Sequence, residues 1–119
     1  MTHSVNIRTK RFEAELAEKQ RHMDWYAKEC QSIDIDTPEE TEEYQKRYYS
    51  IMQERTDTQH TYAKYLRKQI AALKQATLDG NNQVRQKRNQ LKKRYFQLQS
   101  SVAEARATLL QIAPDMMYA

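Results

Sequence analysis

The chain has 119 residues with a single Gly and two Pro, which are too few for the turns of a multi-stranded fold. Residues with good helix propensity dominate and 30% of the residues are charged, so the apolar residues suffice for a narrow seam but not for a thick core. We therefore predict one all-α domain over residues 1–119, folded as an elongated antiparallel three-helix bundle or coiled coil.

The formal net charge of +4 conceals a strong asymmetry along the chain. Residues 1–57 contain 9 Lys/Arg and 13 Asp/Glu, a net charge of −4. Residues 58–103 contain 10 Lys/Arg and one acid, Asp79, a net charge of +9. An acidic half followed by a basic half indicates partners that are recognised by charge.

The chain holds no apolar stretch near the roughly 20 residues needed to cross a bilayer. Its start, MTHSVNIRTKRF, lacks the apolar core of a secretory signal. The single cysteine, Cys30, has no internal disulfide partner, and we expect it to act as a small apolar residue in a helix. These features predict an intracellular, cytoplasmic protein without a membrane span, with a nuclear location left open.

The first predicted helix covers residues 4–31. Its apolar residues fall at alternating steps of three and four once Thr9 and Lys19 are counted in the same series, which is the spacing of a heptad seam. The seam consists of Val5, Phe12, Leu16, Met23, Tyr26, Cys30 and Ile33. Trp25 lies beside this seam and is expected to widen the buried stripe.

The segment SIDIDTPEETEE carries the clearest helix start in the chain. Thr37 suits the N-cap, Pro38 suits the first helical position, and Glu40 completes a capping box with Thr37. We therefore predict a helix break at residues 32–37 and a second helix over 38–78. So short a connection makes the first two helices antiparallel neighbours.

The second helix carries tyrosines along a stripe that also contains polar residues. In the predicted hairpin Glu15 comes opposite Arg55, so the two helices are compatible in charge. Two interpretations of the tyrosines stay open, a tyrosine-rich core or an interface, because tyrosine combines a large contact area with a polar hydroxyl. The candidate interface tyrosines are Tyr44, Tyr48, Tyr62 and Tyr65, with Tyr95 on the next helix.

The stretch LDGNN contains the only glycine and poses a choice between two architectures. As a hinge or turn, Gly80 takes the left-handed conformation that ends a helix, and Asn81 or Asn82 caps the next one. Inside a continuous helix, Asp79 to Asn82 would cost roughly 3 kcal/mol relative to alanines. We predict the turn. The alternative is a helical hairpin with one very long helix, which needs a second chain to cover it.

The third predicted helix covers residues 82–112 and stops before Pro114. It has the most regular apolar seam of the three helices. The seam consists of Val84, Leu91, Tyr95, Leu98, Val102, Ala105, Leu109 and Ile112. The tail, residues 113–119, ends in an apolar group that has two interpretations, a frayed terminus or a docking segment.

The strongest feature outside the seams is the basic run RQKRNQLKKRY. Its cations lie on several faces of one helix, so it has three interpretations: a solvated face, a site for an acidic protein, or a site for nucleic acid or an anionic membrane. The candidate partner-binding cations are Arg85, Lys87, Arg88, Lys92, Lys93 and Arg94.

No motif for catalysis or for a cofactor occurs in the chain. His3, His22 and His60 are dispersed and lack metal-ligand spacing, and no phosphate loop or nucleophile motif is present. We therefore expect no enzyme activity, no cofactor and no metal. The sequence favours a noncatalytic helical adaptor, assembly factor or chaperone-like protein. Its expected partners are helical or acidic proteins, including copies of itself; the alternatives are a nucleic-acid-associated protein that uses residues 85–94 and a structural coiled-coil subunit of a large complex.

Overall fold

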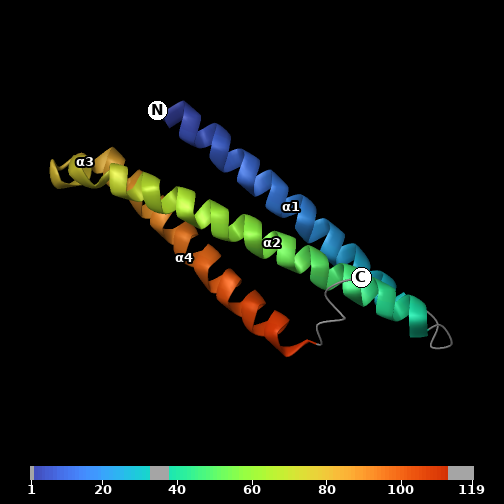
Figure 1. Ribbon diagram of the computed structural model, residues 1–119. Helices are drawn as coiled ribbons and strands as arrows, with labels where there is room; N and C mark the ends of the chain where they lie inside the picture. Colours follow the sequence, from blue (N-terminus) through green and yellow to red (C-terminus); the bar gives the residue numbers. More distant parts are fainter. Residues whose placement is uncertain (1, 33–37, 113–119) are drawn as a thin grey trace.

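The protein folds as an elongated, all-helical bundle with principal extents of 65 × 24 × 18 Å. The computed structural model describes residues 2–32 and 38–112. These residues form α1 (Thr2–Ser32), α2 (Pro38–Ala72), α3 (Lys74–Leu78) and α4 (Asn82–Gln111), with no strand among them (Figure 1). The predicted all-α class is confirmed. The predicted Thr37 cap and the tail lie outside the described residues.

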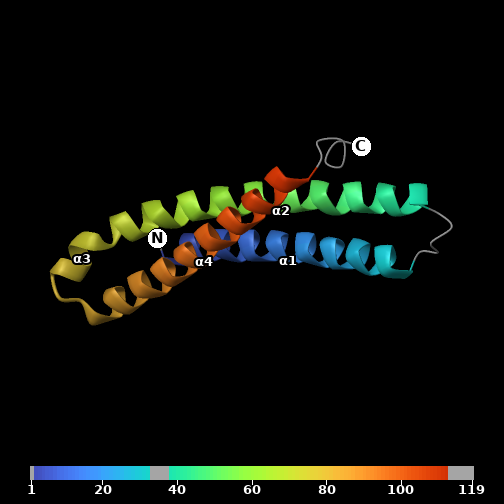
Figure 2. The ribbon, with the colours of Figure 1, turned by 90° about the horizontal axis from the view of Figure 1, so that it is seen from below.

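The helix α2 is the central element of the bundle. In Figure 1 it lies between α1 and α4 and packs against both of them. Figure 2 shows that α1 and α2 run side by side, whereas α4 crosses them at an angle. Within the described residues the backbones of α1 and α4 do not pack against each other, so only side chains link these two helices.

Two apolar clusters hold the three long helices together. The cluster nearer α3 is formed by Leu16, Tyr62, Ala63, Leu66, Leu91 and Leu98, and the other cluster by Met23, Met52, Ala105 and Leu109. Each cluster takes residues from α1, α2 and α4, because the three- and four-residue steps place these side chains on one stripe of each helix. The narrow seam expected from the composition is therefore the core of the bundle.

The pairing between α1 and α2 differs from the predicted one by about one helical turn. Glu15 accepts a hydrogen bond from the Thr58 hydroxyl at 3.3 Å, and Arg55 donates to Gln20 at 2.7 Å. The predicted Glu15–Arg55 pairing is therefore wrong. Burial of the apolar stripe sets this register, because exposed ion pairs are each worth under about 1 kcal/mol whereas each large buried side chain contributes more.

The LDGNN stretch is a turn between helices. Gly80 has φ +85°, and its N–H donates to the Thr77 carbonyl while the Asn81 N–H donates to the Ala76 carbonyl. This pair of bonds is a Schellman motif, which satisfies carbonyls that the helix end leaves unpaired. The Asn81 side chain then accepts from the Val84 N–H at 3.1 Å and caps α4. The predicted turn is confirmed, and the single long helix is wrong.

The predicted helix over residues 38–78 is divided at Leu73, which separates α2 from the short α3. The Arg88 guanidinium reaches from α4 and donates Nε–H to the Ile70 carbonyl at 3.0 Å. In an unbroken helix that carbonyl would accept from the amide of Lys74. A side chain that inserts into the hydrogen-bond ladder is an established cause of a helix kink. No helix in the described residues is both long and apolar enough to cross a membrane.

Candidate functional site

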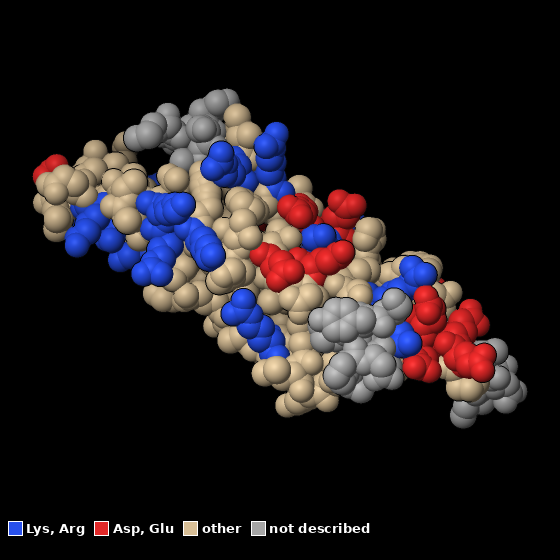
Figure 3. All heavy atoms as spheres, viewed as in Figure 1, with Lys and Arg blue, Asp and Glu red and all other residues tan. Residues whose placement is uncertain are grey.

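Antiparallel packing gathers the positive charges of the chain around the end of the bundle that holds α3. Cations from the first half of α1 join those of α2, α3 and α4 there, although residues 1–57 as a whole are acidic. Figure 3 shows Lys and Arg clustering toward this end and most of the visible acidic side chains nearer the middle and the opposite end, although acidic atoms also appear at the tip of the basic end. We call this region the basic end; its exposed cations are Arg8, Lys10, Arg11, Lys64, Arg67, Lys68, Lys74, Arg85 and Lys93.

Three of the six cations in the predicted basic segment bond to other helices of the same chain. Lys87 donates to the side-chain oxygen of Asn6 at 3.2 Å, and Arg88 donates to the Ile70 carbonyl. Arg94 holds Glu13 of α1. Folding back at Gly80 brings basic residues of α4 near those at the end of α2, and these contacts offset the repulsion because they give the three cations acceptors inside the bundle.

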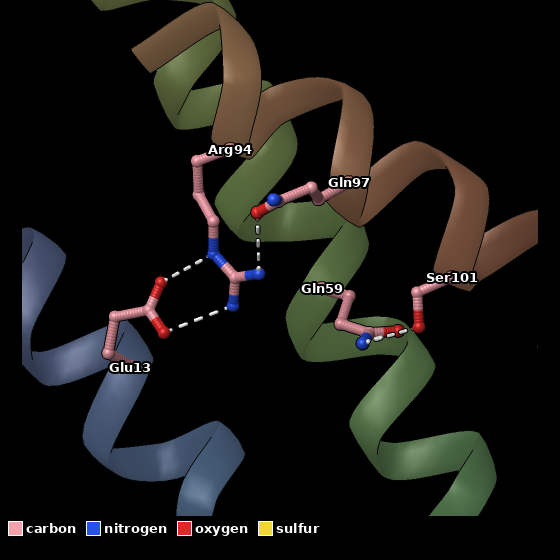
Figure 4. A network of polar contacts seen from close by, with 5 residues as sticks. All are labelled: Glu13, Gln59, Arg94, Gln97 and Ser101. Carbon is pink, nitrogen blue, oxygen red and sulfur yellow. Dashed lines mark hydrogen bonds and ion pairs between the residues drawn. The ribbon is translucent and has the colours of Figure 1, made fainter. Parts of the chain in front are cut away.

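The Arg94–Glu13 pair is the most elaborate of these contacts. Nε and Nη2 of Arg94 donate to the two Glu13 oxygens at 2.7 and 3.0 Å, and Nη1 approaches Gln97 (Figure 4). The guanidinium also lies 5.8 Å from the centre of the Tyr62 ring. Burial opposes the charged form of Arg94, but hydrogen bonds and charge attraction from Glu13 and Tyr62 outweigh it, so the pKa of Arg94 is raised.

The remaining cations of the predicted segment face outward to different degrees. Arg85 and Lys93 are exposed, and Lys92 is half-buried. These side chains make no ion pair with the part of the chain that the structure describes. Arg85 and Lys93 are therefore the members of the predicted segment best placed to meet a partner.

The predicted interface tyrosines do not form one surface. Tyr62 is 1% exposed and stacks on Phe12 with ring centroids 4.8 Å apart, so it belongs to the core. Tyr65 is half-buried near the basic end, with the Arg8 guanidinium 5.2 Å from its ring centre. Tyr95 is also half-buried and packs against the cluster nearer α3.

The other two predicted tyrosines lie toward the opposite end of α2. Tyr48 packs against the second apolar cluster. Tyr44 meets Trp25 edge-on, with ring centroids 6.0 Å apart. Trp25 is 50% exposed, so it widens the buried stripe only in part, and it leaves an aromatic surface near the acidic first turn of α2.

A groove between α2 and α4 adjoins the basic end and was missed by the sequence reasoning. We call it the α2–α4 groove; its volume is about 290 Å³. Ala63, Val102 and the half-buried Tyr95 supply its apolar surface, and no carboxylate among the described residues lines it. Its cations are Lys64 and Arg67 from α2 and Arg106 from α4, with His60 beside them. Arg106 lies some forty positions after Lys64 and Arg67 in the chain. That these cations line one groove depends on the helix register, which no local pattern reveals.

The described residues offer little that could bind a metal ion or carry out redox chemistry. No group of three His, Cys, Asp or Glu side chains there is arranged to hold a metal ion. Cys30 is half-buried, and burial raises the pKa of its thiol. Comparison with protein-family models, curated proteins and solved structures finds no match to this chain.

Proposed function

We propose that this protein is a noncatalytic helical adaptor or assembly factor that binds acidic protein surfaces through its basic end. The observation that supports this proposal is the segregation of charge by the fold. Exposed cations from all four helices surround one end of the bundle, while the four glutamates that open α2 lie at the other. Such a field steers a partner of opposite charge and fixes its orientation.

Two properties of the surface favour a protein partner. Arginine and tyrosine are the residue types that most often carry binding energy at protein interfaces, and Arg8 and Tyr65 already stack at the basic end. The α2–α4 groove combines an apolar surface with cations, and within the described chain no carboxylate or thiol lines it beside His60. That lining suits binding better than proton transfer or nucleophilic attack, which need paired groups.

The test is affinity purification of the tagged protein from its native cell extract, followed by mass spectrometry. The double variant Arg85→Glu/Lys93→Glu reverses two exposed cations of the basic end. Arg21→Glu/Lys28→Glu makes the same change in net charge at exposed positions of α1 outside the basic end. We expect acidic partners to be lost with the first variant and retained with the second. A partner set that is the same for both variants would contradict the proposal.

One observation favours nucleic acid as the alternative partner. The Phe96 ring is 60% exposed and lines a shallow hollow on α4 together with Lys93. An exposed aromatic ring beside a cation is the arrangement on which bases of a single strand stack. Fluorescence anisotropy with labelled single-stranded and duplex oligonucleotides tests this alternative. Binding at low salt that is weakened by Phe96→Ala supports it, and no binding at low salt removes it.

The third hypothesis, a structural subunit of a large complex, rests on the alternative architecture with one very long helix that a second chain must cover. The turn at Gly80 removes that basis, because α4 folds back and buries its seam on α2. Leu91, Leu98 and Leu109 are all buried within the single chain. A second chain is therefore not needed to cover the third seam.

A further inference from the structure

We propose that the α2–α4 groove binds one acidic amphipathic helix of a partner protein. This inference rests on the proposed function and deepens it, because it assigns a binding mode to the acidic partner. The occupant lays its apolar face on the surface formed by Ala63, Val102 and Tyr95, and its carboxylates meet Lys64, Arg67 and Arg106. Docking of an amphipathic helix into a groove between two helices is a common mode of peptide recognition.

The size of the groove indicates a row of side chains as its occupant. Its volume of about 290 Å³ lies at the lower edge of the roughly 300–1,000 Å³ typical of small-molecule pockets. Ala63 and Val102 are each 6% exposed, so they form a closed base. The rim residue Ala103 is exposed and small, and it leaves the side of α4 accessible. Apolar side chains at successive helical turns fit such a shallow, elongated hollow.

The cations set the length of the occupant. Gln59 of α2 bonds Ser101 of α4, and this contact fixes the antiparallel register of the two walls. At 1.5 Å per residue, that register places Arg67 and Arg106 about 20 Å apart along the groove. Lys64 lies one helical turn from Arg67 on the same wall. A helix of about 13 residues therefore spans the site, with carboxylates near both of its ends.

The charges of the groove favour a carboxylate-bearing partner. Within the described chain Lys64, Arg67 and Arg106 are exposed and make no ion pair, so each is available to a carboxylate of a partner. Carboxylates near both ends of a bound helix meet these cations at the two ends of the groove and so fix the orientation of the helix. A nucleic acid would satisfy the same cations with its phosphates, but its charged backbone brings no apolar side chain to pack on Tyr95 above the base of Ala63 and Val102.

The probe is a synthetic, fluorescein-labelled helical peptide of about 15 residues, with glutamates near both ends and leucine or alanine at helical spacing between them. Two matched peptides replace every glutamate by glutamine or by lysine. Three partly exposed ion pairs of about 0.5 kcal/mol each correspond to about a tenfold difference in Kd. We therefore expect the full-length protein to bind the glutamate peptide about tenfold more tightly than the glutamine peptide, and the lysine peptide not at all.

Two variants test the location of the site. Lys64→Glu/Arg106→Glu reverses groove cations, and Ala103→Trp fills the groove from an exposed position where a larger side chain does not disturb the core. Both are expected to abolish peptide binding while the thermal unfolding curve stays close to that of the wild type. The matched control is Arg21→Glu/Lys28→Glu, which makes the same charge change at exposed positions of α1 outside both the groove and the basic end, and it is expected to leave the peptide Kd within about twofold.

The inference is overturned if the lysine peptide binds as well as the glutamate peptide, or if the control weakens binding as much as the groove variants do. It is also overturned if an oligonucleotide displaces the peptide, or if the peptide binds only after residues 113–119 are removed. Partners that depend on Arg85 and Lys93, together with no peptide binding, refute the groove and leave the proposed function standing. Peptide binding in the groove without any such partner supports the groove and contradicts the proposed role of the basic end.

Discussion

Arg94 on α4 holds both carboxylate oxygens of Glu13 on α1, at 2.7 and 3.0 Å, across the edge of the bundle. Because the backbones of α1 and α4 do not pack against each other within the described residues, this pair is a principal polar link between the two helices. Arg94, which the sequence predicts to bind a partner, thus links two helices of the fold. Variants that test partner binding at the basic end should therefore leave Arg94 unchanged.

Breaking this link should destabilise the protein by a modest amount. The side chains of Arg94 and Glu13 are 36% and 42% exposed, so water screens much of their attraction. We expect a coupling free energy of about 1 kcal/mol, because the bidentate geometry adds to the small value of an ordinary surface pair. The double-mutant cycle of Arg94→Ala and Glu13→Gln, measured by urea unfolding, gives this coupling. A coupling of zero would refute the link, and Arg85→Ala, at an exposed position, serves as the control.

Replacement of Gly80 should lower stability for a conformational reason. A Cβ at Gly80 meets nothing within 4 Å, but the residue has φ +85°. The left-handed conformation costs an ordinary residue about 1–2 kcal/mol, and the gain from restricting the unfolded chain is about 0.4–1 kcal/mol. Gly80→Ala should therefore lose about 1 kcal/mol in urea unfolding. Gly80→Asn should lose less, because asparagine tolerates this conformation better. A stabilised Gly80→Ala variant would speak against the turn.

The stability of the bundle should fall at alkaline pH, in part because of Tyr62. Burial, and secondarily its hydrogen bond to Glu13, raise the pKa of Tyr62 above the ordinary tyrosine value near 10. Above about pH 10 the unfolded chain loses this proton while the folded protein keeps it. The contribution of Tyr62 to the free energy of unfolding is therefore constant below that pH. Above it the contribution declines, by at most about 1.4 kcal/mol per pH unit.

The variant Tyr62→Phe isolates this contribution. Unfolding of both proteins by urea is followed from pH 9 to pH 11.5, and the difference between their free energies of unfolding is plotted against pH. At neutral pH the variant should be less stable by about 1 kcal/mol, because it loses the hydroxyl and its favourable interaction with the Glu13 carboxylate. That difference should shrink as the pH rises. A difference that does not change with pH would show that Tyr62 does not titrate in this way.

The buried amide of Gln59 offers a way to stabilise the bundle. Its Nε2 donates to the Ser101 hydroxyl at 2.9 Å, whereas its Oε1 is buried without a partner among the described residues. An unpaired buried polar atom costs about 1–3 kcal/mol, comparable to or larger than the net value of the single hydrogen bond. Gln59→Met with Ser101→Ala should therefore be neutral or up to about 1 kcal/mol more stable. Ser101→Ala alone should be less stable than the wild type, and a double variant weaker than this single one would refute the argument.

Local signals were enough to predict the helices from the sequence. The boundaries at Pro38 and Gly80 and the cap at Asn81 follow from the conformations of residues that lie next to one another. Such preferences act within one turn of the chain and need no knowledge of distant contacts. The division between α2 and α3 at Leu73 escaped prediction because the guanidinium that bonds the Ile70 carbonyl belongs to Arg88, on another helix.

The role of each charged residue was decided only by the tertiary structure. Arg85 and Arg88 lie on one helix, three residues apart, yet Arg85 is exposed and Arg88 bonds α2. The α2–α4 groove likewise exists because packing brings Arg106 of α4 to the same groove as Lys64 of α2. The amino-acid sequence by itself determined an all-helical chain with a basic second half and a turn that joins two helices at Gly80. Which cations are exposed depended on helix register and crossing, because both are set by burial of apolar side chains that lie far apart in the chain.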